Sequence, residues 1–290
     1  MKVTGFTFIR NAVKFDYPVV EAINSILPVC NDFVVAVGNS EDNTSELIQS
    51  IDKQKISIID TIWDDSPEMK KGGKVFALET DKAFHAVPDD SDWAFYIQGD
   101  EAIHEKYLGI IYSAMERWKD DDRVDGLLFN YLHFYGSYDY IGISPMWYRN
   151  EIRVIKNNKE IYSFRDAQGF RKGKNKKLNV IPIDAYIYHY GWVKEPGVMM
   201  DKVKNASKFY QNEKKYKKII SDKDFDYSRI DALSLFTESH PKLMQERINQ
   251  KNWSFEHDIA FNRLSLRYKV KIFLKDHLGI NTFYENYHLI

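Results

Sequence analysis

The chain has 290 residues, enough to bury a substantial core in one large domain or in one domain with an appendage. Its 41 Lys and Arg residues nearly balance its 42 Asp and Glu residues, so the formal charge of -1 gives no overall field that favours nucleic acid as a partner. A hydrophobic fraction of 44% and an aromatic fraction of 15% exclude a disordered chain.

The N-terminal residues predict strands alternating with helices. Residues 3–9 are rich in β-formers, and the apolar residues that follow Pro18 have helical spacing. The apolar run 32–37 predicts a second strand, and Asp42 or Asn43 could cap the helix that begins in the next turn. Further along, "KISIIDTIW" predicts a strand, "KVFALETDKAFHAV" a helix and "DWAFYI" a strand. Because these strands are apolar throughout, we predict an α/β fold with a mostly parallel sheet covered on both faces.

The single cysteine and the N-terminus indicate where the protein is found. Cys30 alone excludes an intrachain disulfide, which fits a reducing cytoplasm. The stretch "MKVTGFTFIRN" is too polar for a signal peptide, and no run approaches the roughly 20 apolar residues that a membrane-spanning helix needs. We therefore expect a cytoplasmic protein whose only membrane contact would be peripheral.

Polar segments follow each predicted strand at one edge of the sheet. They are "RNAVKFDY", "GNSEDNT", "WDDSPEMKKGGK" and "QGDEAIHE". In open α/β sheets, ligands bind beyond the carboxyl ends of the strands, because loops and helix N-termini meet there. We therefore expect the functional site at this edge.

The order of these segments resembles that of the GT-A glycosyltransferases of family 2. The resemblance covers about residues 3–195 and is strongest before residue 105. It implies a GT-A type mixed, mostly parallel central sheet with flanking helices, a catalytic domain at residues 1–195 and a helical C-terminal extension at residues 196–290. It also implies transfer of a sugar from a UDP- or GDP-sugar to a saccharide or lipid-linked acceptor, with inversion, in cell-surface glycan synthesis.

The metal motif of the resembled family, Asp-x-Asp, falls on Gln98, Gly99 and Asp100. By the resemblance, Asp100 is a direct ligand of Mn²⁺ or Mg²⁺, whereas Gln98 offers only a neutral amide oxygen. Glu101 would support Asp100 without binding the metal directly, or would itself be the ligand if the register shifts by one. The resemblance gives His189, in "HYG", as the second ligand, and imidazole favours Mn²⁺. A solvated "GDE" turn and a packed histidine are the alternative interpretations.

An inverting transfer also needs a base that takes the proton of the acceptor hydroxyl. Asp166 is the only carboxylate in "YSFRDAQGF", so it is the candidate catalytic base. A simple ion pair with the neighbouring Arg165 is the alternative.

The resemblance also implies residues that hold the nucleotide and its phosphates. Arg10 and Asn11 end the first strand, where the base and ribose bind in the family, and Asn39 and Asp42 belong to the second turn. In "KKGGK", Lys71 and Lys74 bring ammonium groups to a helix start, where phosphates bind well. A flexible, solvated loop explains "KKGGK" almost as well.

Aromatic residues gather in the middle segment 127–151. They include His133, Tyr135, Tyr138, Tyr140, Trp147 and Tyr148. Aromatic faces stack on sugar rings, so this segment is the predicted acceptor site, with packing under the sheet as the alternative.

Beyond residue 195 the resemblance fades. "DKVKNASKFYQNEKKYKKII" and "LSLRYKVKIFLKDHLGI" are helical and basic on one face. We favour surface helices packed on the catalytic domain over an amphipathic patch at an anionic membrane.

Two other functions stay open at this level. A nucleotidyltransferase shares the nucleotide-binding start, but "FIRNAVKFDY" lacks the glycine-rich loop that such an enzyme needs. A non-catalytic relative that binds a sugar or a nucleotide sugar is the other alternative, because Gln98 replaces an acid.

Overall fold

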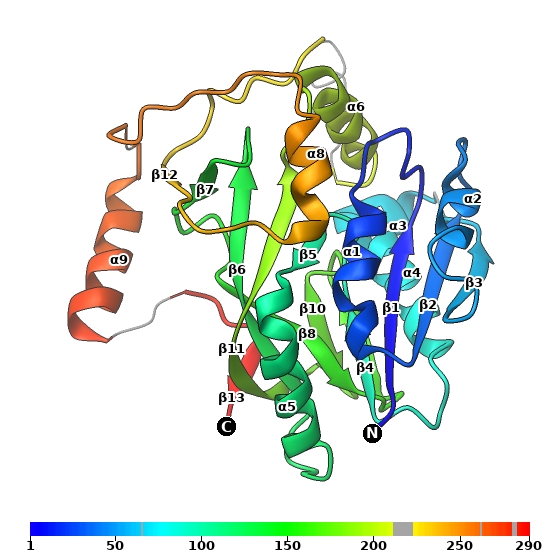
Figure 1. The fold of residues 1–290 in the computed structure, drawn as a ribbon. Coiled ribbons are helices and arrows are strands. Elements are labelled where there is room, and N and C mark those ends of the chain that lie inside the picture. The colour runs from blue at the N-terminus through cyan, green and yellow to red at the C-terminus, as the bar shows by residue number, and fades with distance from the viewer. Residues whose placement is uncertain (65, 211–222, 262, 280–282) are drawn as a thin grey trace.

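The structure is a computed structural model that describes residues 1–64, 66–210, 223–261, 263–279 and 283–290 (Figure 1). Its N-terminal part alternates strands with helices as the sequence predicts. The elements are β1 (Val3–Ile9), α1 (Val19–Ile26), η1 (Leu27–Val29), β2 (Asp32–Gly38), α2 (Thr44–Gln49), β3 (Ile56–Thr61), α3 (Pro67–Lys70), η2 (Lys71–Gly73), α4 (Lys74–His85) and β4 (Trp93–Tyr96).

The middle of the chain is dominated by strands. Its elements are β5 (Glu101–Ile103), η3 (Glu105–Tyr107), α5 (Leu108–Trp118), β6 (Gly126–Tyr135), β7 (Tyr140–Gly142), β8 (Asn150–Lys156), β9 (Ile161–Phe164), β10 (Gly169–Lys172) and β11 (Lys176–Trp192). The main sheet runs in the order β3-β2-β1-β4-β8-β6-β11-β10-β9. From β3 to β11 only β8 runs against its neighbours, so the predicted mixed, mostly parallel α/β sheet is confirmed.

Apolar residues cover both faces of this sheet. In β2, Phe33, Val35 and Val37 point into the cluster on the side of α1 and α5, whereas Val34 and Ala36 point to the side of α4. Successive strand side chains alternate between faces, so an unbroken apolar strand is what a sheet covered on both sides requires. Figure 1 shows α1 and α5 together on the face toward the viewer.

The later segment adds both helices and strands. Its described elements are α6 (Pro196–Ser207), β12 (Leu233–Leu235), η4 (Lys242–Met244), α8 (Gln245–Asn249), α9 (Leu266–Leu278) and β13 (Tyr287–Leu289). β12 pairs with β7 and β13 pairs with β11, so the described part of this segment is not helical throughout. The division at residue 195 stays a prediction, and residues 211–222 of the predicted basic helix lie outside the described residues.

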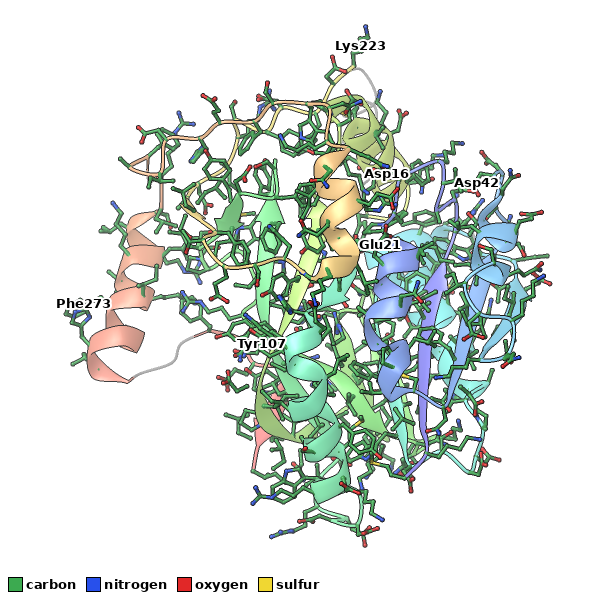
Figure 2. All side chains as sticks on the ribbon, in the orientation of Figure 1. Asp16, Glu21, Asp42, Tyr107, Lys223 and Phe273 are labelled. Carbon is green, nitrogen blue, oxygen red and sulfur yellow. The ribbon has the colours of Figure 1, made fainter. Side chains whose placement is uncertain are left out.

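The segment after residue 195 is tied to the N-terminal part by ion pairs. Arg247 of α8 donates to Asp16 Oδ1 at 2.6 Å and to Glu21 Oε1 at 2.8 Å, and Figure 2 labels both acids beside α8. In contrast, α9 lies at the periphery, with Phe273 directed outward and 53% exposed. Across the described residues, no helix is both long enough and apolar enough to span a membrane.

Candidate functional site

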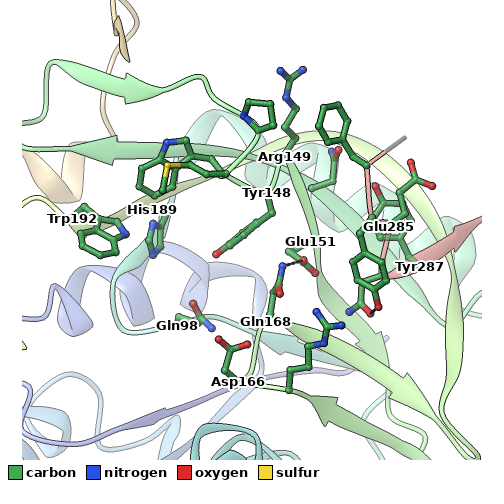
Figure 3. A pocket seen from close by; sticks show the side chains of 18 of the residues that line it. Gln98, Tyr148, Arg149, Glu151, Asp166, Gln168, His189, Trp192, Glu285 and Tyr287 are labelled. Carbon is green, nitrogen blue, oxygen red and sulfur yellow. Dashed lines mark hydrogen bonds between the residues drawn. The ribbon is translucent and has the colours of Figure 1, made fainter. Parts of the chain in front are cut away.

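A cavity of about 670 Å³ lies where β4 ends and is walled by segments far apart in the sequence. Its lining includes Gln98, Trp147, Tyr148, Arg149, Glu151, Asp166, Gln168, His189, Trp192, Tyr210 and Tyr284. Figure 3 shows Gln98, Tyr148 and Asp166 pointing toward its interior. The sequence predicts ligand binding at this edge of the sheet, and three segments that it singled out meet at one cavity there.

Asp100 and Glu101, adjacent in the chain, have different partners. Glu101 is fully buried and receives two hydrogen bonds from Arg153, at 2.7 and 2.9 Å. Tyr131 Oη donates to Glu101 Oε1 at 2.8 Å and the Gln98 backbone N–H donates to Oε2 at 3.1 Å. Both oxygens of Glu101 are thus engaged in the core, so Glu101 is not placed to bind a ligand.

Asp100 instead faces a lysine from α6. Lys202 Nζ lies 2.9 Å from Asp100 Oδ2 and donates a second hydrogen bond to the Gly191 carbonyl at 2.7 Å. Burial raises the pKa of Asp100, but the charge of Lys202 and its hydrogen bond outweigh this effect and hold that pKa below its usual range. Both side chains keep some exposure, 14% for Asp100 and 17% for Lys202, so the pair lies within reach of solvent.

His189 is held by a chain of hydrogen bonds through His133. His133 Nε2 lies 2.8 Å from the Tyr148 carbonyl, and His133 Nδ1 lies 3.1 Å from His189 Nδ1. Burial, together with His189, lowers the pKa of His133 to about 3, so its ring is neutral. Because a carbonyl can only accept, His133 Nε2 carries the proton and His189 Nδ1 is the donor to His133. This leaves a lone pair on His189 Nε2, which lies 3.8 Å from Asp100 Oδ1.

These groups are poor ligands for a divalent cation as they are placed. Among the described residues, no three His, Cys, Asp or Glu side chains converge to hold a metal ion. Lys202 already compensates the charge of Asp100, and the ammonium of Lys194 acts on Asp100 as well. A divalent cation prefers several oxygen ligands with a net negative charge. The donor set therefore does not fit a metal ion, and the metal roles of Asp100 and His189 stay predictions.

Asp166 occupies a strained turn between β9 and β10. Its neighbours Arg165 and Ala167 have φ values of 60° and 64°, in the left-handed region that non-glycine residues rarely adopt. Tyr210 Oη donates to Asp166 Oδ2 at 3.1 Å. The guanidinium of Arg165 lies 5.0 Å from the ring centre of Tyr284, and no described ion pair joins it to Asp166. The half-buried Asp166 carboxylate is therefore held at the cavity wall, with no paired cation among the residues that the structure describes.

The predicted nucleotide-binding residues after β1 and β2 do meet. Arg10 Nε donates to the Asn39 carbonyl at 3.0 Å, and Asn11 Oδ1 accepts from the Glu41 backbone N–H at 2.7 Å. Asp42 accepts from the backbone N–H of Lys14 at 2.7 Å. These hydrogen bonds link the two loops to each other, and whether the same side chains bind a nucleotide stays a prediction.

The "KKGGK" turn approaches the Asp166 loop. Gly73 has φ of 72°, and a Cβ there would lie 2.8 Å from Cβ of Asp166 and 2.8 Å from the ring of Tyr210. Only glycine permits this close approach at a left-handed position. Lys74, at the start of α4, is half exposed with its ammonium 3.8 Å from Glu68, and the phosphate roles of Lys71 and Lys74 stay predictions.

The aromatic segment 127–151 divides between core and cavity. Trp147 and Tyr148 line the cavity, whereas Tyr135 and Tyr138 are buried in the core. His133 stacks on Trp147 with ring centres 5.1 Å apart. Packing thus explains part of the cluster, and Trp147 and Tyr148 are its members that line this cavity.

Several residues of the site were not singled out from the sequence. They are Arg153, Glu151, Gln168, Lys194 and Lys202. Gln168 Nε2 donates to Glu151 Oε1 at 2.9 Å in the cavity wall (Figure 3), and burial raises the pKa of Glu151 to about 8. The available signal was charge inside apolar strands: "NEIRVI" places Glu151 and Arg153 where β8 should be apolar. Lys202 gave no such signal, because a lysine on an amphipathic helix is ordinary.

No protein-family model matches the chain, and a search of curated proteins finds no match. Among solved structures, TarS of S. aureus in complex with UDP matches with TM-score 0.39 and 13% identity, over 76% of this chain and 70% of that one. A longer TarS structure matches over 42% of its own length, so this chain spans less than half of it.

Two further structures match over about half of this chain. Glucosyl-3-phosphoglycerate synthase of Mycobacterium tuberculosis, in complex with Mn²⁺, UDP and glucosyl-3-phosphoglycerate, has TM-score 0.31 and 14% identity over 47% of this chain and 45% of that one. The 4-diphosphocytidyl-2C-methyl-D-erythritol synthase of Anaerococcus prevotii has TM-score 0.32 and 10% identity, over 54% and 70%. Likeness at this level does not establish a family or an activity for this chain.

Proposed function

We propose that the protein is a glycosyltransferase that takes a sugar from a nucleoside diphosphate sugar and passes it to a saccharide or lipid-linked acceptor. The observation that carries this proposal is the meeting of Asp166, His189 and the strand-end residue Gln98 at one cavity beyond β4. Carboxyl ends of parallel strands are where α/β folds bind ligands. A cavity of about 670 Å³ has the size of a small-molecule site.

Asp166 is the proposed catalytic base. A carboxylate without a paired cation can accept the proton of the acceptor hydroxyl while that oxygen attacks the anomeric carbon. Left-handed residues flank it on both sides, a kind of backbone strain that is common at active sites, and Tyr210 donates a hydrogen bond to its side chain. A base in this role is consistent with inversion, in which the acceptor attacks opposite the departing nucleotide.

The aromatic wall is the proposed site of the transferred sugar or the acceptor. Trp147, Tyr148 and Trp192 line the cavity on the side of His189. Their rings offer apolar faces, and the tyrosine hydroxyl adds a hydrogen-bonding group. The nucleotide would bind along the loops after β1 and β2, with Arg10, Asn11, Asn39 and Asp42 near the base and ribose and Lys71 and Lys74 near the phosphates.

One observation favours a non-catalytic relative that binds a nucleotide sugar. Gln98 Nε2 donates to the Ala167 carbonyl at 3.1 Å, so the residue that replaces the family's first acid helps to hold the Asp166 loop. A protein that had lost catalysis would keep the cavity and the loop contact but not the turnover.

A ligand screen with a turnover assay tests the proposal. UDP-, GDP-, CDP-, dTDP- and ADP-sugars are added to the wild-type protein with and without Mn²⁺, and melting temperature and nucleotide release are measured. A ligand that binds the native state raises the melting temperature. We expect one nucleotide class to bind and to be released slowly as the diphosphate. Binding without release in the presence of saccharide acceptors would favour the non-catalytic relative, and absence of binding in every condition would refute both.

A further inference from the structure

Lys202 has the unused bonding capacity of a phosphate ligand, and its partner Asp100 lies 3.8 Å from His189, which lines the cavity. An ammonium group has three N–H donors. Two of those of Lys202 bind Asp100 Oδ2 and the Gly191 carbonyl, at 2.9 and 2.7 Å. No third hydrogen bond of this group is found among the described residues. Tyr17, whose ring centre lies 5.0 Å from Lys202 Nζ, lies 5.0 Å from Lys194 Nζ as well. The ring thus has an ammonium group close to it from each lysine.

The charges of this cluster favour an anion over a divalent cation. Asp100 and Lys202 compensate each other, and Lys194 adds a further positive group when it is protonated. Lys194 is buried, with 1% exposure, and donates to the Asp16 carbonyl. The next acid in the chain, Glu101, is neutralised by Arg153 in the core. A diphosphate would enter a neutral to positive site, whereas a metal ion would meet the ammonium of Lys202, and that of Lys194 when it is protonated.

We propose that the ammonium of Lys202, positioned by Asp100, supplies the positive charge at the donor's diphosphate that a metal ion supplies in enzymes with two acids at this position. The inference rests on the proposed function. Asp100 is then a positioning residue that orients Lys202. A site without a metal ion requires no second acid, which explains why Gln98 can stand where the resembled family has an aspartate. Donor binding through this site does not depend on a divalent cation.

The test is UDP binding to the wild-type protein in EDTA and in Mn²⁺, measured by isothermal titration calorimetry, with GDP, CDP, dTDP and ADP in parallel. The preferred nucleoside diphosphate is expected to bind with affinities that differ less than threefold between the two conditions. Binding that requires Mn²⁺ would overturn the role of Lys202 but leave the glycosyltransferase proposal standing. Absence of binding in both conditions would overturn the glycosyltransferase proposal, and this inference with it.

Substitutions on α6 test whether Lys202 supplies the positive charge that binds the diphosphate. Lys202→Met is expected to weaken the diphosphate at least tenfold in EDTA, and Lys202→Arg to retain most of the affinity. Lys204→Met, two residues further along α6, is the matched control and should bind as the wild type does. Equal affinity of Lys202→Met and the control would overturn the proposal. Because the wild-type titration in EDTA needs no variant, the inference stays testable even if Lys202→Met does not fold.

Discussion

Asp100 and Glu101 are consecutive acids, and each faces one cation, yet they belong to different regions of the molecule. Glu101 and Arg153 are both fully buried and share two hydrogen bonds, so the pair is closed to other partners. Asp100 and Lys202 share one hydrogen bond and both stay partly exposed. Buried pairs of this kind hold structure in place, whereas an open pair can exchange a partner for a ligand. Four predictions test this contrast between buried, closed positions and positions that a ligand can reach.

The largest effect is expected at the sealed pair. Arg153→Met leaves the Glu101 charge buried without a partner, which costs about 3–5 kcal/mol of the free energy of unfolding. Urea denaturation followed by fluorescence measures it. Lys202→Met, which breaks the open pair, should cost less than about 2 kcal/mol, because solvent can reach Asp100. Equal losses for the two variants would remove the distinction between the pairs.

At the cavity wall, where Asp166 lies, the expected effect is on the rate of transfer and not on stability. Asp166→Asn removes the proposed base and should lower the transfer rate about 10²- to 10⁴-fold, with nucleotide affinity unchanged. Steady-state kinetics with the preferred donor measures the rate. The exposed Asp184 on β11 provides the control, and Asp184→Asn should keep wild-type kinetics. A full rate in Asp166→Asn would exclude this residue as the base.

A second buried acid, Glu151 in the cavity wall, should make stability depend on pH. The pKa of Glu151 is raised from 4.5 to about 8, so the folded state favours the protonated acid. Its contribution is complete below pH 4.5 and is lost as the pH rises from there to about 8. Glu151→Gln should therefore be the more stable protein at pH 9, by on the order of 2 kcal/mol. Urea midpoints at pH 5 and pH 9 measure the difference, and an equal slope with pH in both proteins would contradict the assignment.

The smallest effect is expected at an exposed lysine of the "KKGGK" turn. Lys74→Ala should weaken nucleoside diphosphate binding only about two- to fivefold, and less at high salt, because solvent screens an exposed charge. Titration at low and high ionic strength measures this. Lys53→Ala, an exposed lysine elsewhere, is the control, and identical affinities for the two variants would remove Lys74 from the phosphate site.

The sequence predicted the parallel half of the sheet and the edge that carries the cavity because these depend on local patterns. Apolar runs mark β1, β2 and β4, and the polar stretches after them must lie at the carboxyl edge. The ion-pair partners of the two acids were not predictable from the sequence. Lys202 reaches Asp100 only through the packing of α6, and Arg153 reaches Glu101 across two strands. A single sequence therefore could not show that one acid of "QGDE" is sealed in the core while the other stays open.

The long strand β11 has a consequence for how the protein is made. β11 pairs with β6, β5 and β10, and also with β13, whose partner residues lie more than a hundred positions further along the chain. During synthesis β11 leaves the ribosome well before β13. The part of β11 that pairs with β13 therefore stays unpaired until β13 has been made. An unpaired edge attracts other strands. The interval between these two segments is therefore a time when nascent chains are exposed to misassociation, and a slower rate of translation would lengthen it.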